Sequence, residues 1–177
     1  MSRDSTLSPE LLHCADVVRQ RFPRRVGKAV VADVEALACR LCASLEEYPL
    51  SAGVLACTVF LEGRCHTAIQ EGLRRRSPER WRFTLAHEEA EILLHRYLSP
   101  VTDRDRRERI CDAFAAEMLL PARVVADSVS ILAGACGGRA CVDVSRKEEL
   151  ARAMSRTYGV SVTTARISIS QSLAEAV

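Results

Sequence analysis

The sequence shows little sign of a segment that would direct a protein into a membrane or out of the cell, and none is expected. Its first residues, MSRDSTLSPELLHCADVV, contain no apolar core of the kind that a signal peptide carries. Its apolar runs are only a few residues long, so none is expected to span a bilayer. The sequence therefore predicts a cytoplasmic protein with no membrane partner.

Aromatic residues and excess charge are also scarce. Aromatic residues make up 5% of the 177 residues, and the formal net charge at pH 7 is only +2. Hydrophobic residues reach 48%, enough for a sizeable core. This composition argues against a disordered chain and against a protein coated with nucleic acid, and the length predicts one domain, or one domain with a small helical appendage.

The eight cysteines do not form a recognisable disulfide or zinc-finger framework. Thiols stay reduced in the cytosol. Cys39 and Cys42 form a lone C-x-x-C without a second pair to complete a zinc finger. They lie in the helical pattern VEALACRLCASL, which favours two small core residues; a redox or metal pair is the minor alternative.

Hydrophobic periodicity and turn residues predict an α+β fold with a short β-sheet beside a mainly helical body. Ser8 and Asp33 are placed at or near the starts of the first two helices, and Gly159 breaks the last two. The expected helices cover residues 6–22, 32–45, 77–97, 103–120, 122–132 and 145–176, with a break at Ser99-Pro100; the expected strands cover 53–63 and 64–70, and a basic loop covers 71–80. As domains we expect a metallopeptidase-like unit at 1–133, a glycine-rich linker at 134–143 and a helical hairpin at 144–177.

The stretch RWRFTLAHEEAEILLHR carries the first chemical signal. His87 and Glu91 are four residues apart on a helix, so one ion can touch both side chains. Glu88 lies about 100° further round the helix, on the flank where a general base belongs. The H-E-x-x-H motif of zinc peptidases would have histidine at position 91, where this chain has Glu91.

The next helix supplies the rest of an expected metal site. Glu108 and Asp112 are four residues apart and share one face. If the two helices pack antiparallel, Glu108 is a third ligand, which leaves one position open for water. Asp112 can then accept a hydrogen bond from the His87 ring and orient it.

Together, RFTLAHEEAEILLH and ERICDAFAAEMLLPARVV resemble the ImmA/IrrE family of metallopeptidases, over about residues 28–170. The family pattern is roughly R-F-T-L-A-H-E-L-G-H-L-L-L-H, then E-x-x-A-[ND]-x-F-A-A-x-L-L-M-P. The resemblance implies a zincin-like, zinc-dependent cytosolic endopeptidase that cleaves a helix-turn-helix repressor. It matches His87 to the first zinc ligand, Glu88 to the general base and Glu108 to the third ligand. Glu91 replaces the second histidine, and Glu89 and Ala90 replace Leu-Gly.

Three interpretations of Glu91 stay open. Its carboxylate can bind the ion, Zn²⁺ by expectation, although a second oxygen ligand shifts the preference towards Mn²⁺ or another divalent ion. His95 or His66 can substitute, but His95 lies roughly 12 Å from His87 along the helix. Finally, a degenerate cleft can bind a partner without cutting it. We expect a metal site of His87, Glu91 and Glu108, catalysis by Glu88, and no organic cofactor.

The expected partner is a regulatory protein, such as a helix-turn-helix repressor. The strand at 64–70 would lie along the substrate as an edge template. Arginines 74, 75, 76, 80 and 82 form a basic segment that favours a solvated loop over a docking patch. The C-terminal hairpin has helix-turn-helix spacing, but its second helix carries only Arg166 as a cation, so DNA binding is possible without being favoured.

Overall fold

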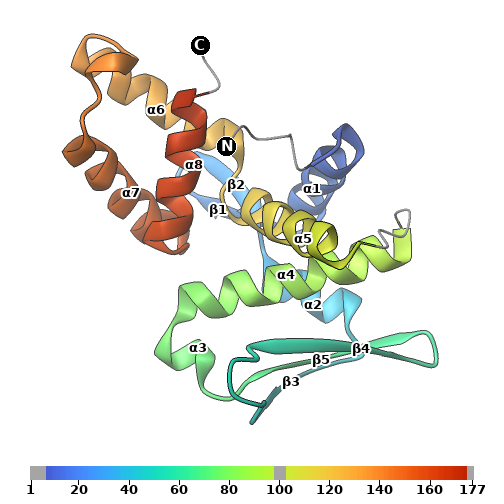
Figure 1. The fold of residues 1–177 in the computed structure, drawn as a ribbon. Coiled ribbons are helices and arrows are strands. Elements are labelled where there is room, and N and C mark those ends of the chain that lie inside the picture. Colours follow the sequence, from blue (N-terminus) through green and yellow to red (C-terminus); the bar gives the residue numbers. More distant parts are fainter. Residues whose placement is uncertain (1–6, 98–102, 175–177) are drawn as a thin grey trace.

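A computed structural model describes residues 7–97 and 103–174 and confirms the α+β class (Figure 1). The strands are β1 Pro23–Val26, β2 Ala29–Ala32, β3 Ser44–Tyr48, β4 Ala56–Leu61 and β5 Arg64–Gln70. The helices are α1 Pro9–Arg21, α2 Val34–Leu41, α3 Leu73–Arg76, α4 Pro78–Tyr97, α5 Arg104–Leu119, α6 Ala122–Cys136, α7 Val144–Tyr158 and α8 Val162–Ala174, with a 3₁₀ turn at Arg139–Cys141. The predicted break at Ser99-Pro100 lies outside the described residues.

Short polar side chains set the helix starts. Ser8 accepts a hydrogen bond from the Leu11 amide ahead of Pro9, the first residue of α1. Asp33 and Asp103 cap α2 and α5 in the same way, each accepting from the amide three residues on. A cap oxygen satisfies an amide that has no partner inside the helix, which is why these residues mark the boundaries. The predicted starts at Ser8 and Asp33 are confirmed.

The three-stranded sheet has the order β3-β5-β4. Strand β5 pairs in parallel with β3 and antiparallel with β4, so it is the central strand. The expectation that residues 64–70 form an edge template is therefore wrong, because both edges of β5 are already paired. Side chains alternate along β5, and Cys65, Thr67 and Ile69 are buried. In the described part of the chain, β4 is an edge strand with an unpaired outer side.

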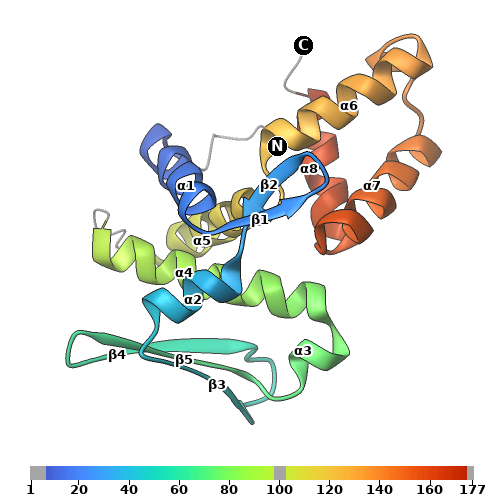
Figure 2. The same cartoon turned by 180° about the vertical axis from the view of Figure 1, so that it is seen from behind.

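Helix α4 is the central element of the fold. It lies between the three-stranded sheet on one side and α5 on the other, and α2 packs against it on the sheet side (Figures 1 and 2). It therefore buries residues nearly all round, including Leu85, Ala86, Ala90 and Ile92. A helix buried on opposite faces has no continuous polar stripe, so polar residues along it end up inside the protein.

Helices α6, α7 and α8 lie together at one end of this assembly. Helix α8 packs on α6 and α7, and Ala165 and Ile169 of α8 belong to the main core. Arg82 of α4 donates hydrogen bonds to the carbonyl oxygens of Tyr158 and Gly159, at the turn between α7 and α8. Helix α6 continues to Cys136, inside the range expected as a linker. The division into domain, linker and hairpin stays a prediction.

Several local predictions differ from the structure. The helix expected over 32–45 ends at Leu41, because Ser44–Tyr48 pairs with β5. The hairpin of β1 and β2 was not predicted, and α3 lies inside the expected basic loop. Cys39 is exposed and Cys42 half-buried, so Cys39 is not the core residue that the pattern indicated. In each region, pairing or packing across the fold overrides the local pattern.

No single helix among the described residues is long and apolar enough to cross a membrane. Helices α5 and α6 pass that test only as a pair, by length and composition, with a bend of 62° between them.

Candidate metal centre

The ring of His87 is fixed between α4 and α5. Its Nδ1 lies 2.9 Å from Oδ1 of Asp112, and a carboxylate can only accept, so Nδ1 carries the proton. Along α5, Arg107 reaches Glu91 of α4 while Asp112 reaches His87. The order of contacts runs in opposite directions along the two helices, which confirms the predicted antiparallel packing. The neutral tautomer leaves the lone pair of Nε2 available to an ion.

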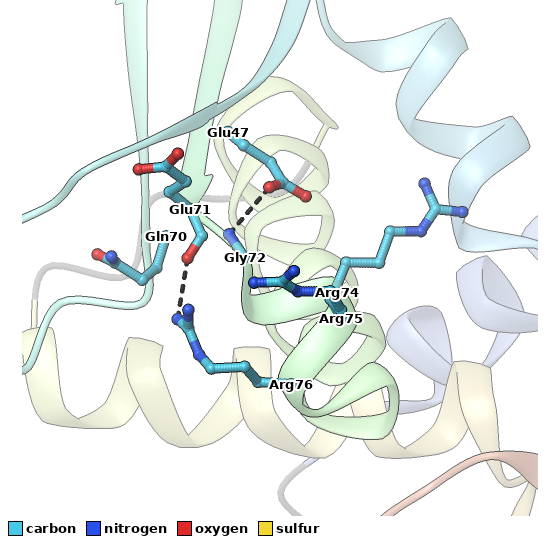
Figure 3. Close-up of a pocket in the computed structure, with 7 residues that line it drawn as sticks. All are labelled: Glu47, Gln70, Glu71, Gly72, Arg74, Arg75 and Arg76. Atoms are coloured by element: carbon cyan, nitrogen blue, oxygen red, sulfur yellow. Dashed lines mark hydrogen bonds between the residues drawn. The ribbon is translucent and has the colours of Figure 1, made fainter.

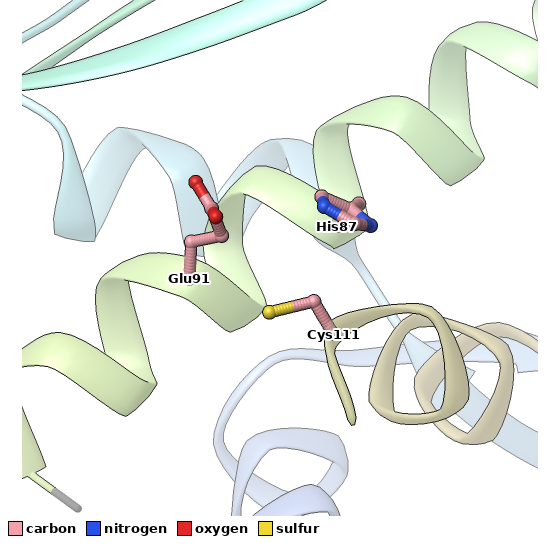
Figure 4. Close-up of side chains that lie close together, drawn as sticks. All are labelled: His87, Glu91 and Cys111. Atoms are coloured by element: carbon pink, nitrogen blue, oxygen red, sulfur yellow. The ribbon is translucent and has the colours of Figure 1, made fainter. Parts of the chain in front are cut away.

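Three potential ligand atoms converge at this point. Ligand atoms of His87, Glu91 and Cys111 all lie within 4.8 Å of one another, as Figure 4 shows for the two helices that carry them. Sequence reasoning brought His87 and Glu91 together but missed Cys111. The signal was present in the spacing, because Cys111 follows Glu108 by three residues and so shares its face of α5.

Glu108 lies at the mouth of the same site. Its Oε2 is 3.3 Å from Nε2 of His87, and 42% of its side chain is exposed. That distance exceeds the roughly 2.7–2.9 Å of a charge-assisted hydrogen bond. No group of three that contains Glu108 converges as closely as the group with Cys111, among the residues described.

These separations fit a small divalent ion. Two ligands bound to tetrahedral zinc at its usual bond lengths lie roughly 3.4–3.7 Å apart. The 3.3 Å between His87 and Glu108 is close to this size, and the ligand atoms of the group with Cys111 need to approach one another by about 1.4 Å at most from their 4.8 Å limit. Side-chain rotation supplies such a shift. The residues present are therefore compatible with a bound divalent metal.

The site is rich in negative charge, which shows in the pKa of its members. Burial alone would lower the pKa of His87, but the hydrogen bond and charge of Asp112, with Glu88 and Glu108, raise it. Burial raises the pKa of the Cys111 thiol to about 12, and Glu91 and Glu108 add to the shift. One cation lies close to this group, since Arg107 Nε is 3.8 Å from a carboxylate oxygen of Glu91.

A residue of the edge strand β4 holds the carboxylate of Glu88 in place. The hydroxyl of Thr58 on β4 donates to Oε2 of Glu88 over 2.6 Å. Thr67 lies 2.9 Å from Thr58, so with its proton committed to Glu88, Thr58 accepts from Thr67. Burial raises the pKa of Glu88, while the Thr58 bond opposes that shift. Glu88 is thus a buried carboxyl in a fixed position beside the ligand cluster.

Glu89, its neighbour in sequence, points into the protein instead. It is 0% exposed, and neither carboxylate oxygen has a hydrogen-bond partner among the described residues. Burial raises its pKa well above the ordinary value and the charge of Asp33 adds to the shift, while the nearby backbone of Ala38 on α2, which makes no hydrogen bond of ordinary geometry to Glu89, opposes it. Glu89 therefore belongs to the packing between α4 and α2 and not to the candidate site.

The other histidines considered as ligands lie elsewhere. The ring of His95 stacks against Phe60 with 4.1 Å between centroids. Nδ1 of His66 is 3.0 Å from the Ser44 hydroxyl, on the neighbouring strand. Neither residue belongs to the converging group of ligand atoms.

Several arginines of the basic segment are occupied by contacts within the fold. Arg74 pairs with Glu35 at 2.6 Å and lies over the Trp81 ring. Arg76 donates to the Glu71 carbonyl beside a hollow of 570 Å³ at the end of the sheet (Figure 3). In α8, Arg166 pairs with Glu148 at 2.9 Å. These contacts favour structural roles over contacts with a nucleic acid.

An apolar pocket adjoins the candidate site. It has a volume of 320 Å³ and lies between α4, α5 and α8, lined among others by Phe83, Asp112, Ile167 and Ser168. Asp112 is common to this pocket and to the His87 contact, and Phe83 lies one helical turn before His87. The pocket and the ligand cluster are thus connected through Asp112, which lines the one and contacts His87 of the other.

Comparison with known families gives one match. The family model described as the IrrE N-terminal-like domain, a peptidase family, matches residues 73–130. The matched segment contains α3, α4, α5 and the first part of α6, and with them the residues of the candidate site except Thr58 on β4 and Thr67 on β5. No curated protein matches the chain significantly.

Proposed function

Residues 73–130 match the model of the IrrE N-terminal-like peptidase family, and from this premise we propose that the chain is a divalent-metal-dependent endopeptidase. The observation that carries the proposal is the convergence of His87 and Glu91 of α4 with donor groups of α5, inside the segment that the family model matches. A chance cluster of acidic groups would not also contain a histidine oriented by a carboxylate on its far nitrogen.

The residues take distinct roles in this proposal. His87, Glu91 and Glu108 hold the ion, Zn²⁺ by expectation, and Asp112 keeps the His87 ring in place. A bound divalent ion supplies Lewis acidity towards the peptide carbonyl and towards water. Glu88 Oε1 or Oε2 takes a proton from the attacking water and returns it to the leaving amine, while Thr58 holds the carboxylate in position. These roles need a raised pKa at Glu88, which its burial provides.

The substrate would bind along β4 and not along β5. Strand β4 has an unpaired outer edge in the described structure, and it carries the Thr58 that contacts Glu88. An extended peptide can pair with such an edge through its backbone, which aligns it with the catalytic carboxylate. The pocket of 320 Å³ beside Asp112 would receive one apolar side chain of that peptide.

The family resemblance supplies the substrate class within this proposal. Members of the ImmA/IrrE family cleave helix-turn-helix repressors, so a regulatory protein of that kind, in the cytoplasm, is the proposed substrate. A protein substrate is what a peptidase domain requires, and the internal contacts of Arg74 and Arg166 make DNA the less favoured partner.

A non-catalytic role is the second candidate function, and one contact favours it. Arg107 approaches Glu91 to 3.8 Å, so the carboxylate that replaces the second histidine has a cation available without any metal. A cleft stabilised in this way would bind a regulator without cutting it.

Metal content and cleavage together decide between the two functions. The protein would be purified without chelator, its metal measured by elemental analysis, and a peptide library from a digested cell lysate scanned for new termini. The peptidase proposal expects about one ion per chain and cleavage that is lost in Glu88→Gln while the metal stays. Absence of bound metal after addition of zinc or manganese, or equal activity in Glu88→Gln, would overturn it and favour the binding module.

A further inference from the structure

Cys111 occupies a position that packing alone does not account for. Its side chain is 0% exposed, and Sγ projects from α5 towards α4, between the levels of His87 and Glu91 (Figure 4). Cys111 belongs to the same hydrophobic core cluster as Phe114 and Met118 of α5, which have no ligand groups beside them in the converging set. Cys111 combines the same complete burial with close approach to two potential metal ligands.

We propose that the Cys111 thiolate is a ligand of the ion held by His87 and Glu91. This inference rests on the metal site of the proposed function and adds a residue that the family pattern does not predict. The three ligand atoms lie within 4.8 Å of one another, and none of the other described groups of histidine, cysteine and carboxylate converges in this way. The backbone positions of the two helices already bring them close, so rotation of the three side chains completes the site.

A thiolate changes which ion the site prefers. With two carboxylates and one histidine, a site has hard oxygen ligands that shift the preference towards Mn²⁺. Sulfur is a soft donor that favours Zn²⁺, and mixed sets of histidine, cysteine and carboxylate are within the usual zinc ligands. Cys111 therefore offsets the loss of the second histidine at position 91. The expected order of affinity is zinc well above manganese.

Cys111 must lose its thiol proton when it binds the ion as a thiolate. The thiol S–H bond breaks as the bond from sulfur to the ion forms, and the proton passes to the buffer. Zinc binding should therefore release one proton that a variant without Cys111 does not release. Glu108, with its exposed side chain 3.3 Å from His87, would keep its ligand role beside Cys111, and water would take a fifth position, to which catalytic zinc sites can expand.

Cobalt substitution tests the assignment directly. Thiolate coordination to Co²⁺ produces an intense near-ultraviolet charge-transfer band that nitrogen and oxygen ligands do not give. The band is expected in the cobalt-loaded parent and in Cys65→Ala, which removes another fully buried cysteine away from the site. It should be absent in Cys111→Ser and Cys111→Ala, and zinc affinity in both should fall about 10-fold or more.

The outcomes separate this inference from the proposed function. Cobalt bound at one per chain without the band in the parent, or unchanged zinc affinity in Cys111→Ser, would overturn the ligand role and leave the site of His87 and Glu91 standing. A parent that binds neither zinc nor cobalt would overturn both. Should Cys111→Ala fail to fold, as judged by circular dichroism, the parent spectrum alone decides.

Discussion

The buried carboxyl of Glu89 is expected to lower the free energy of unfolding of the protein. Its side chain is completely buried between α4 and α2, and neither oxygen has a hydrogen-bond partner among the described residues. A buried polar group without a partner costs about 1–3 kcal/mol of stability. Glu89→Leu removes that cost, keeps a side chain of similar size and adds apolar contact. The substitution is therefore expected to raise the free energy of unfolding by about 1–3 kcal/mol.

The assay is equilibrium unfolding in urea, followed by circular dichroism. For a chain of this length, each kcal/mol should also raise the melting temperature by about 2–4 °C. Glu149→Leu, on the exposed surface of α7, is the matched control and should change stability by no more than about 0.5 kcal/mol. Glu89→Gln keeps a buried polar group and should show little of the gain.

The gain should also depend on pH in a definite direction. The raised pKa of Glu89 means that the folded protein keeps this proton to a higher pH than the unfolded chain does. The parent therefore loses stability as pH rises from the ordinary pKa of glutamate through the raised folded value, and Glu89→Leu does not. A destabilised Glu89→Leu protein, or a gain that shrinks as pH rises, would refute the reasoning and show that the carboxylate is stabilised in the fold.

Three further predictions concern the site. Glu91→His restores the second histidine, so zinc should bind more tightly by calorimetric titration; an unchanged affinity would show that residue 91 does not face the ion. Thr58→Val removes the 2.6 Å hydrogen bond to Glu88 and should slow peptide cleavage about 10-fold with metal content unchanged. Thr58→Ser keeps the hydroxyl and should behave as the parent. Equal cleavage rates for Thr58→Val and the parent would exclude the positioning role. Ser168→Trp should fill the 320 Å³ pocket and alter the preference for apolar residues among the cleaved peptides. Thr163→Trp lies outside the pocket lining and should leave that preference unchanged. Identical cleavage patterns for Ser168→Trp and the parent would mean that the pocket takes no substrate side chain.

Periodicity was enough to predict the helices that build the site. The spacing of His87 and Glu91, and of Glu108 and Asp112, fixes which side chains share a face of a helix, because that depends only on local geometry. The antiparallel packing was an assumption, and the contacts of Arg107 with Glu91 and of Asp112 with His87 agree with it. Cys111 was missed because a cysteine in an apolar helix looks like a core residue in sequence. Only the approach of α4 shows that it faces ligand groups.

The strands were harder to predict because their order depends on contacts far apart in sequence. Ser44 and Leu45 continue the helical pattern of the residues before them, yet Ser44–Tyr48 forms the parallel partner of β5, more than 20 residues later. The pairing of β3 puts β5 in the centre and leaves β4 at the edge, which reverses the expected template. Parallel strands are joined by a long crossover connection, so the sequence between them contains no short turn motif that would predict the pairing.

Glu88 and Glu89 show why a motif cannot be interpreted position by position. The two carboxyls are adjacent and chemically identical, and α4 is buried on both sides, so both lose water. Glu88 meets a hydroxyl donor from β4, whereas Glu89 faces α2, where the backbone of Ala38 opposes the rise in its pKa but no hydrogen bond of ordinary geometry forms. The same burial thus yields a positioned proton acceptor in one case and an unsatisfied core group in the other. The edge strand, through Thr58, makes this distinction, and for this reason the sheet belongs to the proposed active site as much as the two helices do.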